Sequence, residues 1–333
     1  MRVMVTGAAG FIGTHLSRAL LNAGADVIRI DSFTDYYSPA LKRARQEALE
    51  AGTEQPLILE VDLTKPLHRG LGDHDPIDAI IHLAAQPGVR LPVAHFGRYV
   101  QANILALSNV FDFAATLGIP HVLYASSSSV YGDTTSLPFC EAALDLDPSS
   151  FYGSSKLAGE LLASGYCQSG AVSARGMRYF TVYGPWGRPD MAYFRLIASA
   201  LGEWRFTLTG SPTIRRDFTF VEDTISSTIA LLEDLLTRPA GHHDVVNVGG
   251  GNSRTMGELI EAVAALTGAP LSIEQGDPIA ADMAATEADF GYLEAVTGQR
   301  PRVPLEVGLE RCLAWASRED VKPKLRAWIE STL

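Results

Sequence analysis

A glycine-rich heptapeptide near the amino terminus restricts the fold of this chain more than any other segment. The apolar run 2–6 leads directly into Gly-Ala-Ala-Gly-Phe-Ile-Gly at 7–13, and a helical pattern extends over 11–22. Glycines at such a junction permit a tight turn and let the backbone approach a pyrophosphate, which the first N–H groups of the helix then bind. An ordinary structural turn is the alternative. The dinucleotide contacts expected here are Gly7, Gly10, Phe11, Ile12 and Gly13.

Strand and helix patterns alternate through the first half of the chain. Helices between strands produce right-handed crossovers, so the pattern predicts an α/β fold with a doubly wound parallel sheet of the Rossmann type. The elements after residue 180 are shorter and predict a smaller C-terminal α/β lobe that binds the substrate. The expected domains are therefore 1–180 and 181–333, with segments of 217–248 returning to the first. Strands are expected over 2–6, 26–30, 57–61, 77–83, 121–125 and 172–179, and helices over 11–22, 93–117 and 151–168.

Charge and cysteine content exclude several classes of partner. The 333 residues carry a net charge of -11, which disfavours nucleic acid and anionic membranes as partners. The three cysteines show neither metal-ligand spacing nor a disulfide framework, so no metal is expected and a reducing compartment is favoured. We expect no signal peptide and no segment long and apolar enough to span a membrane. These observations predict a cytoplasmic protein.

An acidic residue ends the second expected strand and bears on the choice of cofactor. A carboxylate at Asp31 binds ribose hydroxyls and repels a 2′-phosphate, so NAD is favoured over NADP. Arg29 complicates this interpretation, because strand alternation places it on the same face as Asp31. The further cofactor contacts expected are Asp62, Leu63, Leu83, Ala84, Ala85, Asn103 and Tyr179, although an exposed helical asparagine is an alternative for Asn103.

A tyrosine and a lysine four residues apart are the candidate catalytic pair. Tyr152 and Lys156 share a helix face, and the ammonium, together with an oxidised nicotinamide, would lower the pKa of the phenol from its usual value of about 10. The tyrosinate could then remove a hydroxyl proton as hydride leaves the carbon. Serines 126–129 follow the fifth strand, at the sheet edge where ligands bind. A surface Tyr–Lys pair and a polar loop are the alternatives.

Several motifs resemble one enzyme family. They are GAAGFIG, IHLAA, the serines before VYG, YGSSK and RRDFTFVEDT. Together they resemble the extended short-chain dehydrogenases/reductases, in particular the nucleotide-sugar epimerases and dehydratases. The segments DYYSPALKRAR, AAQPGVR and YFTVYGPWGRPDM are most similar to UDP-glucuronate 4-epimerases. The resemblance implies that Tyr152 is the base, that Lys156 holds the nicotinamide ribose, and that Ser127 or Ser128 hydrogen-bonds the reacting oxygen.

The same resemblance implies how the substrate is bound. Related dehydratases and decarboxylases carry an acidic residue where this chain has Ser128 and Ser129, so inversion at carbon 4 is favoured over elimination. Hexose epimerases of the family usually have asparagine at the position of Thr181, and a threonine leaves room for a carboxylate. The candidates that hold the sugar and its carboxylate are Ser128, Ser129, Thr181, Arg188 and Arg90.

The remaining expectations concern the nucleotide, the assembly and rival activities. Arg216 matches the family's phosphate-binding arginine, and Asp277 is a candidate for the nucleotide ribose, with surface ion pairing as the alternative. The resemblance implies a homodimer through the helices near 93–117 and 150–168, which contain Leu105, Leu107, Val110 and Phe111. Rival activities are a UDP-hexose 4-epimerase, a UDP-glucuronate decarboxylase and a non-catalytic NAD-binding regulator.

Overall fold

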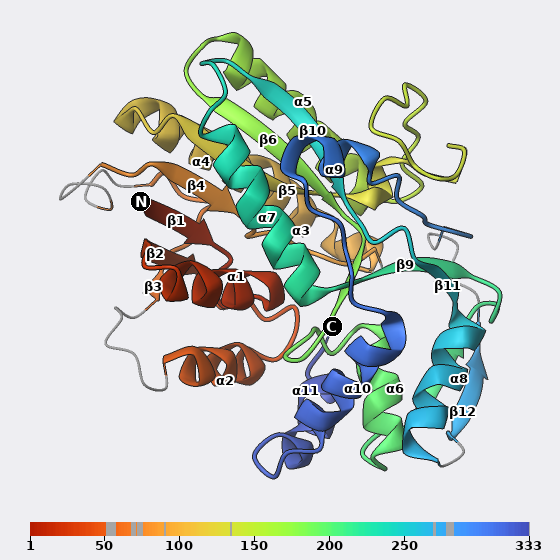
Figure 1. Cartoon of the computed structure of the whole chain (residues 1–333). Coiled ribbons are helices and arrows are strands. Elements are labelled where there is room, and N and C mark those ends of the chain that lie inside the picture. Colours follow the sequence, from red (N-terminus) through yellow and green to blue (C-terminus); the bar gives the residue numbers. More distant parts are fainter. Residues whose placement is uncertain are drawn as a thin grey trace.

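A seven-stranded sheet forms the centre of the molecule in the computed structural model (Figure 1). The strand order is β10-β6-β5-β4-β1-β2-β3, and each neighbouring pair is parallel. Strands β2 and β3 are added on one side of β1, and β4, β5, β6 and β10 on the other. The strand order therefore reverses between β1 and β4, and ligands bind at such a point in open parallel sheets. The strands are β1 (Arg2–Thr6), β2 (Asp26–Asp31), β3 (Leu59–Glu60), β4 (Ala79–His82), β5 (His121–Ser127), β6 (Ser173–Tyr179) and β10 (His243–Val248). The structure describes residues 1–50, 58–67, 71, 76–89, 91–133, 135–268, 271–277 and 283–332.

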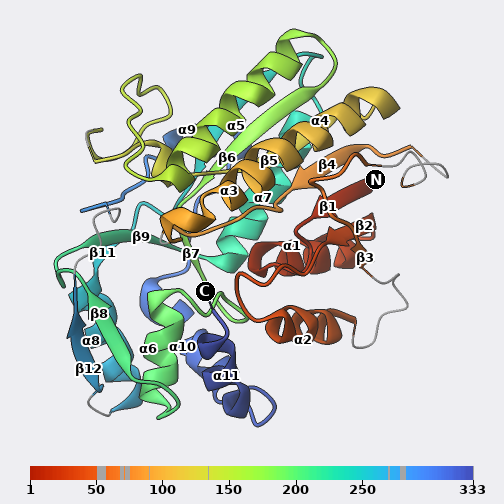
Figure 2. The ribbon, with the colours of Figure 1, turned by 180° about the vertical axis from the view of Figure 1, so that it is seen from behind.

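Helices cover both faces of this sheet. The strands alternate their side chains, so Val3 and Val5 enter one buried apolar cluster while Met4 enters the other. One face carries α1 (Phe11–Asn22), α2 (Pro39–Glu50), α7 (Val221–Leu235) and α9 (Gly291–Thr297) (Figure 1). The opposite face carries α3 (Gly97–Tyr99), a π-helical turn (Val100–Leu105), α4 (Ala106–Leu117) and α5 (Phe151–Gln168) (Figure 2).

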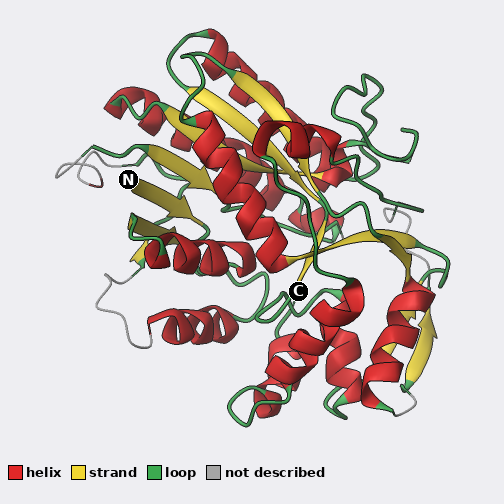
Figure 3. Cartoon of the chain, viewed as in Figure 1, coloured by secondary structure: helices red, strands yellow, loops and turns green. Residues whose placement is uncertain are grey.

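A smaller lobe lies beyond the carboxyl ends of the main strands (Figure 3). Strands β8 and β12 form a parallel pair there, and β11, β9 and β7 form a three-stranded sheet. The helices are α6 (Ala192–Ala200), α8 (Met256–Thr267), α10 (Leu305–Ala316) and α11 (Leu325–Glu330). The strands are β7 (Thr181–Tyr183), β8 (Phe206–Thr209), β9 (Arg215–Phe220), β11 (Ser253–Thr255) and β12 (Ile273–Gly276).

The predicted fold class is confirmed, with differences in detail. Helices α1 and α5 have the bounds expected from their patterns. Of the segments 217–248, the strand β10 pairs with β6 in the main sheet, whereas β9 belongs to the three-stranded sheet. Helix α2 was not expected, because Lys42, Arg45 and Gln46 lie on the face that it buries, so the sequence shows no clear apolar periodicity there.

The segment Val93–Leu117 corrects one expectation. By length and composition alone it is apolar enough to cross a membrane, so the sequence does contain such a segment. In the structure, Leu107, Val110 and Phe111 are buried in the apolar cluster beneath α4. Leu105 is 44% exposed and remains on the surface.

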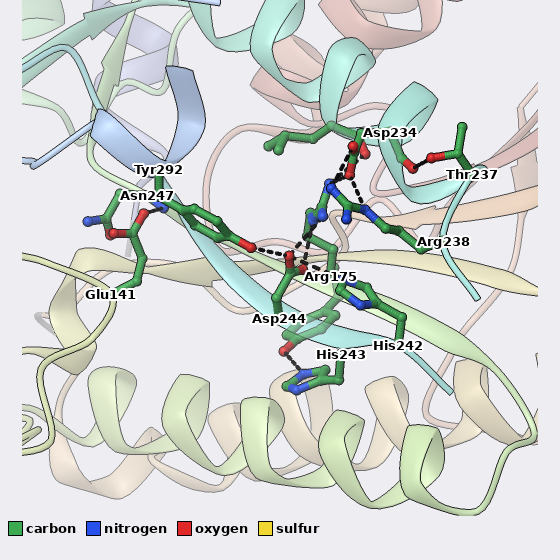
Figure 4. A network of polar contacts seen from close by, with 12 residues as sticks. Glu141, Arg175, Asp234, Thr237, Arg238, His242, His243, Asp244, Asn247 and Tyr292 are labelled. Atoms are coloured by element: carbon green, nitrogen blue, oxygen red, sulfur yellow. Dashed lines mark hydrogen bonds and ion pairs between the residues drawn. The ribbon is translucent and has the colours of Figure 1, made fainter. Parts of the chain in front are cut away.

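A polar network fixes β10 against β6 at the edge of the main sheet (Figure 4). Arg175 of β6 is fully buried and donates to both carboxylate oxygens of Asp244, at 2.7 and 2.8 Å. Its third nitrogen lies 2.8 Å from Asp234 of α7, which also pairs with Arg238. The returning strand and helix α7 are therefore held to the sheet by charge-assisted hydrogen bonds.

Candidate active site

A cavity of about 670 Å³ lies between the carboxyl ends of the main strands and the smaller lobe. Nearly all site residues expected from the sequence line it. They are Gly7, Gly10, Phe11, Ile12, Gly13, Asp31, Asp62, Leu63, Leu83, Ala84, Ala85, Ser127, Ser128, Ser129, Tyr152, Lys156, Tyr179, Thr181, Arg188 and Arg216. Asn103 and Asp277 do not line the cavity, and Arg90 lies outside the described residues.

The glycine turn has the geometry that a dinucleotide requires. Gly7 has φ +70°, and a Cβ atom at this position would lie 2.6 Å from the backbone nitrogen of Ala84. Only glycine therefore permits β1 and β4 to approach each other here. Helix α1 begins after Gly10, which makes no side-chain cap, so its first N–H groups face the cavity without a side-chain acceptor at the cap.

The Asp31 carboxylate is fixed at the edge of the cavity. It accepts hydrogen bonds from the N–H groups of Ala9 at 3.0 Å and Phe33 at 2.7 Å, and Lys42 lies 3.9 Å away. Arg29 is buried, donates to the side chain of Gln46, and does not line the cavity. The ambiguity between Asp31 and Arg29 in the sequence is thus removed, because Asp31 is the residue that faces the cavity.

Helix α5 places the Tyr–Lys pair beside the end of β5. Ser150 caps the helix by accepting from the N–H of Gly153 at 3.0 Å, so Tyr152 lies in the first turn. The Lys156 Nζ donates to the carbonyl of Ala125 at 2.8 Å and lies 5.9 Å from the Tyr152 ring centroid. Burial lowers the pKa of Lys156 to about 8, although the Glu160 carboxylate acts in the opposite direction.

The pKa of the Tyr152 phenol differs from the expectation. Burial raises the pKa of Tyr152, while the Arg188 charge and a hydrogen bond with Ser127 act to lower it. The chain's own groups therefore do not produce the net decrease expected from the sequence. Of the four serines, Ser127 hydrogen-bonds the phenol, and Ser126 is directed to Glu160 at 2.5 Å.

An arginine with a paired carboxylate lines the same cavity as the Tyr–Lys pair. The Nε and Nη2 atoms of Arg188 donate to the two oxygens of Asp190, at 3.0 and 2.5 Å, and the hydroxyl of Tyr36 donates to Asp190 at 3.3 Å. Burial lowers the pKa of Arg188, but the Asp190 carboxylate, Tyr36 and Tyr152 together raise it more, so the guanidinium stays charged. One edge of this guanidinium, Nε and Nη2, is occupied by Asp190, and no hydrogen bond of Nη1 is recorded among the described residues.

Thr181 opens β7 and is half-buried on the wall of the same cavity. No hydrogen bond of its hydroxyl is recorded among the described residues. Arg216 reaches the cavity from β9 and donates to the carbonyl of Met283 at 2.8 Å. Together with Lys42 and Arg195, Arg216 makes part of the wall cationic despite the acidic chain.

Two expected contacts have other positions. Asn103 is buried, accepts from the N–H of Gln86 at 2.8 Å, and donates to the Ser155 hydroxyl at 2.9 Å. It therefore holds the chain after β4 against α5 behind the cavity wall, and it is not exposed either. Asp277 follows β12 and does not reach the cavity. In both cases the sequence showed a polar residue near the site without showing where its side chain lies.

Sequence reasoning missed Tyr36, Lys42 and Asp190 as lining residues. Tyr36 and Lys42 lie in DYYSPALKRAR and Asp190 in GRPDM, segments that resemble the family. A search for ionisable residues within these segments could have found them, since each lies within 12 positions of a residue already selected.

Comparisons with known proteins show the family of the chain. Residues 3–249 match the NAD dependent epimerase/dehydratase family. The chain is 37% identical over 331 residues to UDP-glucuronate 4-epimerase 6 of Arabidopsis thaliana, covering 95% of this chain and 71% of the relative. It is 34% identical over 336 residues to a probable UDP-glucuronate 4-epimerase of Rhizobium meliloti strain 1021, covering 95% and 96%. The structure of UDP-glucuronic acid 4-epimerase from Bacillus cereus with UDP-glucuronic acid and NAD matches with a TM-score of 0.85, at 34% identity, covering 95% and 98%.

Proposed function

We propose, from the premise that this chain belongs to the NAD dependent epimerase/dehydratase family, that it converts UDP-glucuronate to UDP-galacturonate by inversion at carbon 4. The observation that carries the proposal is the shared cavity. Ser127, Tyr152, Lys156, Thr181 and Arg188 all line it. The residues proposed to oxidise the sugar and the residues proposed to bind its carboxylate therefore lie in one cavity.

The residues that hold NAD follow from the geometry of the cavity. The Gly7 turn and the first N–H groups of α1 receive the pyrophosphate, and Asp31 binds the adenosine ribose. Lys156 holds the nicotinamide ribose while it stays hydrogen-bonded to the Ala125 carbonyl. When bound, NAD accepts a hydride from carbon 4 and later returns it, so none is consumed.

The chain's own groups move the proton and control the intermediate. Tyr152 removes the proton of the 4-hydroxyl as carbon 4 is oxidised. It returns the proton after the 4-keto sugar has rotated in the site and its opposite face is reduced. Ser127 orients the reacting oxygen. Ser128 and Ser129 stand where an acidic residue would be needed to eliminate a second group, so re-reduction on the opposite face is the productive exit.

The 4-keto uronate is a β-keto acid and tends to lose carbon dioxide. Decarboxylation requires the breaking bond to overlap the carbonyl π system, so a carboxylate held out of that alignment survives. We assign this task to Arg188 and Thr181, with Ser128 and Ser129 as further donors. Asp190 accepts from Nε and Nη2 of Arg188 and so fixes the guanidinium. The carboxylate of the sugar would then bind at the other edge of this group.

One assay tests this function directly. The purified protein is incubated with UDP-glucuronate and the UDP-sugars are resolved. UDP-galacturonate is the expected product, and Tyr152→Phe should bind the substrate but give no turnover because only the base is lost. UDP-pentose with carbon dioxide would indicate a decarboxylase, and turnover of neutral UDP-hexoses alone would refute the uronate assignment.

We also propose a cytoplasmic homodimer with a cofactor domain at 1–180, to which segments of 217–248 return, and a sugar-binding domain at 181–333. Apolar side chains on the outer surface of the helical layer support the dimer, with Leu105 44%, Phe151 40% and Leu161 69% exposed. Three free cysteines suit a reducing compartment. Light scattering at micromolar concentration should give a dimer mass, and Leu161→Lys should reduce it; a monomer mass for the parent would refute the dimer.

A further inference from the structure

A buried arginine joins the dinucleotide turn to the loop that carries Arg188. Arg45 of α2 is fully buried, and its Nη1 donates to the carbonyl of Ala9 at 3.2 Å and to the Tyr37 hydroxyl at 2.7 Å. Its Nε and Nη2 donate to the carbonyls of Trp186 at 2.8 Å and Gly187 at 2.9 Å. All four acceptors are uncharged. The guanidinium fork therefore spans two segments of the chain that are far apart in the sequence.

A histidine of α1 holds the preceding peptide of the same loop. His15 Nε2 lies 2.9 Å from the carbonyl of Pro185, which can only accept, so the ring is the donor. Burial lowers the pKa of His15 to about 4, which keeps the ring neutral at physiological pH. Three successive carbonyls, 185 to 187, thus accept hydrogen bonds from the cofactor-side helices.

The other side of the loop is held by the smaller lobe. Trp186 has φ +63°, a left-handed conformation that is costly for a bulky residue. Its ring packs against Trp315 of α10 at 5.2 Å and Trp328 of α11 at 6.3 Å between ring centroids. The loop runs between α2 and these C-terminal helices (Figure 1). Contacts on both sides therefore determine its backbone.

The two ends of this connection are both parts of the proposed site. The N–H of Ala9 donates to Asp31 and the C=O of Ala9 accepts from Arg45, so the ribose-binding carboxylate and Arg45 hold the two peptide groups that flank Ala9. At the other end, the residue after Gly187 is Arg188, whose guanidinium pairs with Asp190 in the cavity.

We propose that Arg45, assisted by His15, is a positioning residue that sets Arg188 relative to the dinucleotide turn and so determines selectivity for a carboxylate on the sugar. The proposal rests on the proposed function. Arg45 itself contacts neither substrate nor cofactor. It keeps the guanidinium of Arg188 at a fixed distance from the dinucleotide turn, so that the sugar is bound with carbon 4 correctly placed for oxidation.

Arg45→Lys is the test, because lysine keeps the charge but cannot span carbonyls of both segments. In a Tyr152→Phe background, which prevents turnover, calorimetry compares the Kd values of UDP, UDP-glucose and UDP-glucuronate with NAD present. UDP and UDP-glucose should bind within twofold of the parent, and UDP-glucuronate should bind at least about fivefold more weakly. In the active enzyme, the share of UDP-pentose among the products should rise.

Gln46→Met is the matched control. Gln46 is the next residue on α2 and contacts the same turn through the Ala8 carbonyl, at 3.3 Å, but none of its recorded contacts is with the loop. It should leave the ratio of UDP-glucuronate to UDP-glucose affinity unchanged. An Arg188→Ala background should abolish the selectivity effect of Arg45→Lys, because the effect acts through Arg188.

Uniform weakening of all three ligands, or a selectivity change that persists without Arg188, would overturn the proposal. If Arg45→Lys does not fold, His15→Phe carries the test, since it keeps a ring against Phe11 and removes only the donor. It should shift the ratio about twofold or more in the same direction, and an unchanged ratio would refute the proposal. The proposed function is judged separately: a parent enzyme without preference for UDP-glucuronate over UDP-glucose refutes that function first.

Discussion

Removing the Thr181 hydroxyl should measure how strongly the carboxylate is held. Thr181→Val keeps the branched shape at the start of β7, where the side chain is half-buried, so little stability should be lost. A hydrogen bond to a charged group contributes about 1.5–3 kcal/mol, which corresponds to roughly 10- to 150-fold in Kd. Arg188 remains in the variant, so the lower end, about tenfold, is the expected loss.

The assay has a binding part and a product part. Kd for UDP-glucuronate is measured in the Tyr152→Phe background, and UDP alone serves as the control ligand that should be unaffected. The active Thr181→Val enzyme is then followed over many turnovers by UDP-sugar analysis and NADH absorbance. A freed carboxylate should be lost as carbon dioxide, giving UDP-pentose when the hydride is returned to the 4-keto sugar. NADH should accumulate when the 4-keto sugar leaves before it is reduced. Binding within twofold of the parent, with equally fast and clean epimerisation, would show that Thr181 does not hold the carboxylate.

Three further predictions concern cofactor choice, pH and stability. The parent should bind NAD much more tightly than NADP, and Asp31→Ser should reduce that preference about tenfold or more, because Lys42, 3.9 Å away, would then pair with the 2′-phosphate; equal NADP binding by the parent refutes this assignment. Burial lowers the pKa of His82 to about 3, so below a pH of about 6.5 this histidine is protonated in the unfolded chain while it stays neutral in the folded chain. His82 alone should therefore lower the free energy of unfolding by about 2 kcal/mol between pH 7.5 and 5. Urea titrations should show a weaker fall for His82→Gln, and parallel curves would contradict this. Arg175→Met should lower the unfolding free energy by about 3 kcal/mol, since the Asp244 carboxylate loses both bonds from the guanidinium and, among the described residues, keeps only its contacts with Tyr292 and His242. Tm should fall by roughly 4 °C, and calorimetry showing no change would refute the role of the network.

Local patterns made the cofactor side of the site predictable. The glycines at 7–13 and the pair Tyr152 and Lys156 act through spacing along one strand, turn or helix, and that spacing is visible in the sequence. Their positions in the cavity follow from the parallel sheet, which brings the ends of β1, β4 and β5 to one edge. The roles of these side chains remain predictions until the variants are measured.

Long-range contacts made the rest unpredictable. Arg45 meets the carbonyls of Trp186 and Gly187 across about 140 positions, and no spacing rule connects them. Asn103 was recognised as polar, but its burial depends on the partner Ser155, 52 positions away. The pKa of Tyr152 could not be predicted either, because burial, which raises it, exists only in the folded chain.

The return of β10 to the main sheet has a consequence for protein engineering. A chimera joined at residue 180 would transplant the edge strand and helix α7 along with the sugar-binding elements, because both follow that point in the chain. The host's β6 would then have to accept a foreign strand, and Arg175 would have to find its carboxylates in the donor's sequence. Grafting substrate preference between such enzymes therefore calls for exchanging several short inserts, while the returning strand and its helix stay with the recipient.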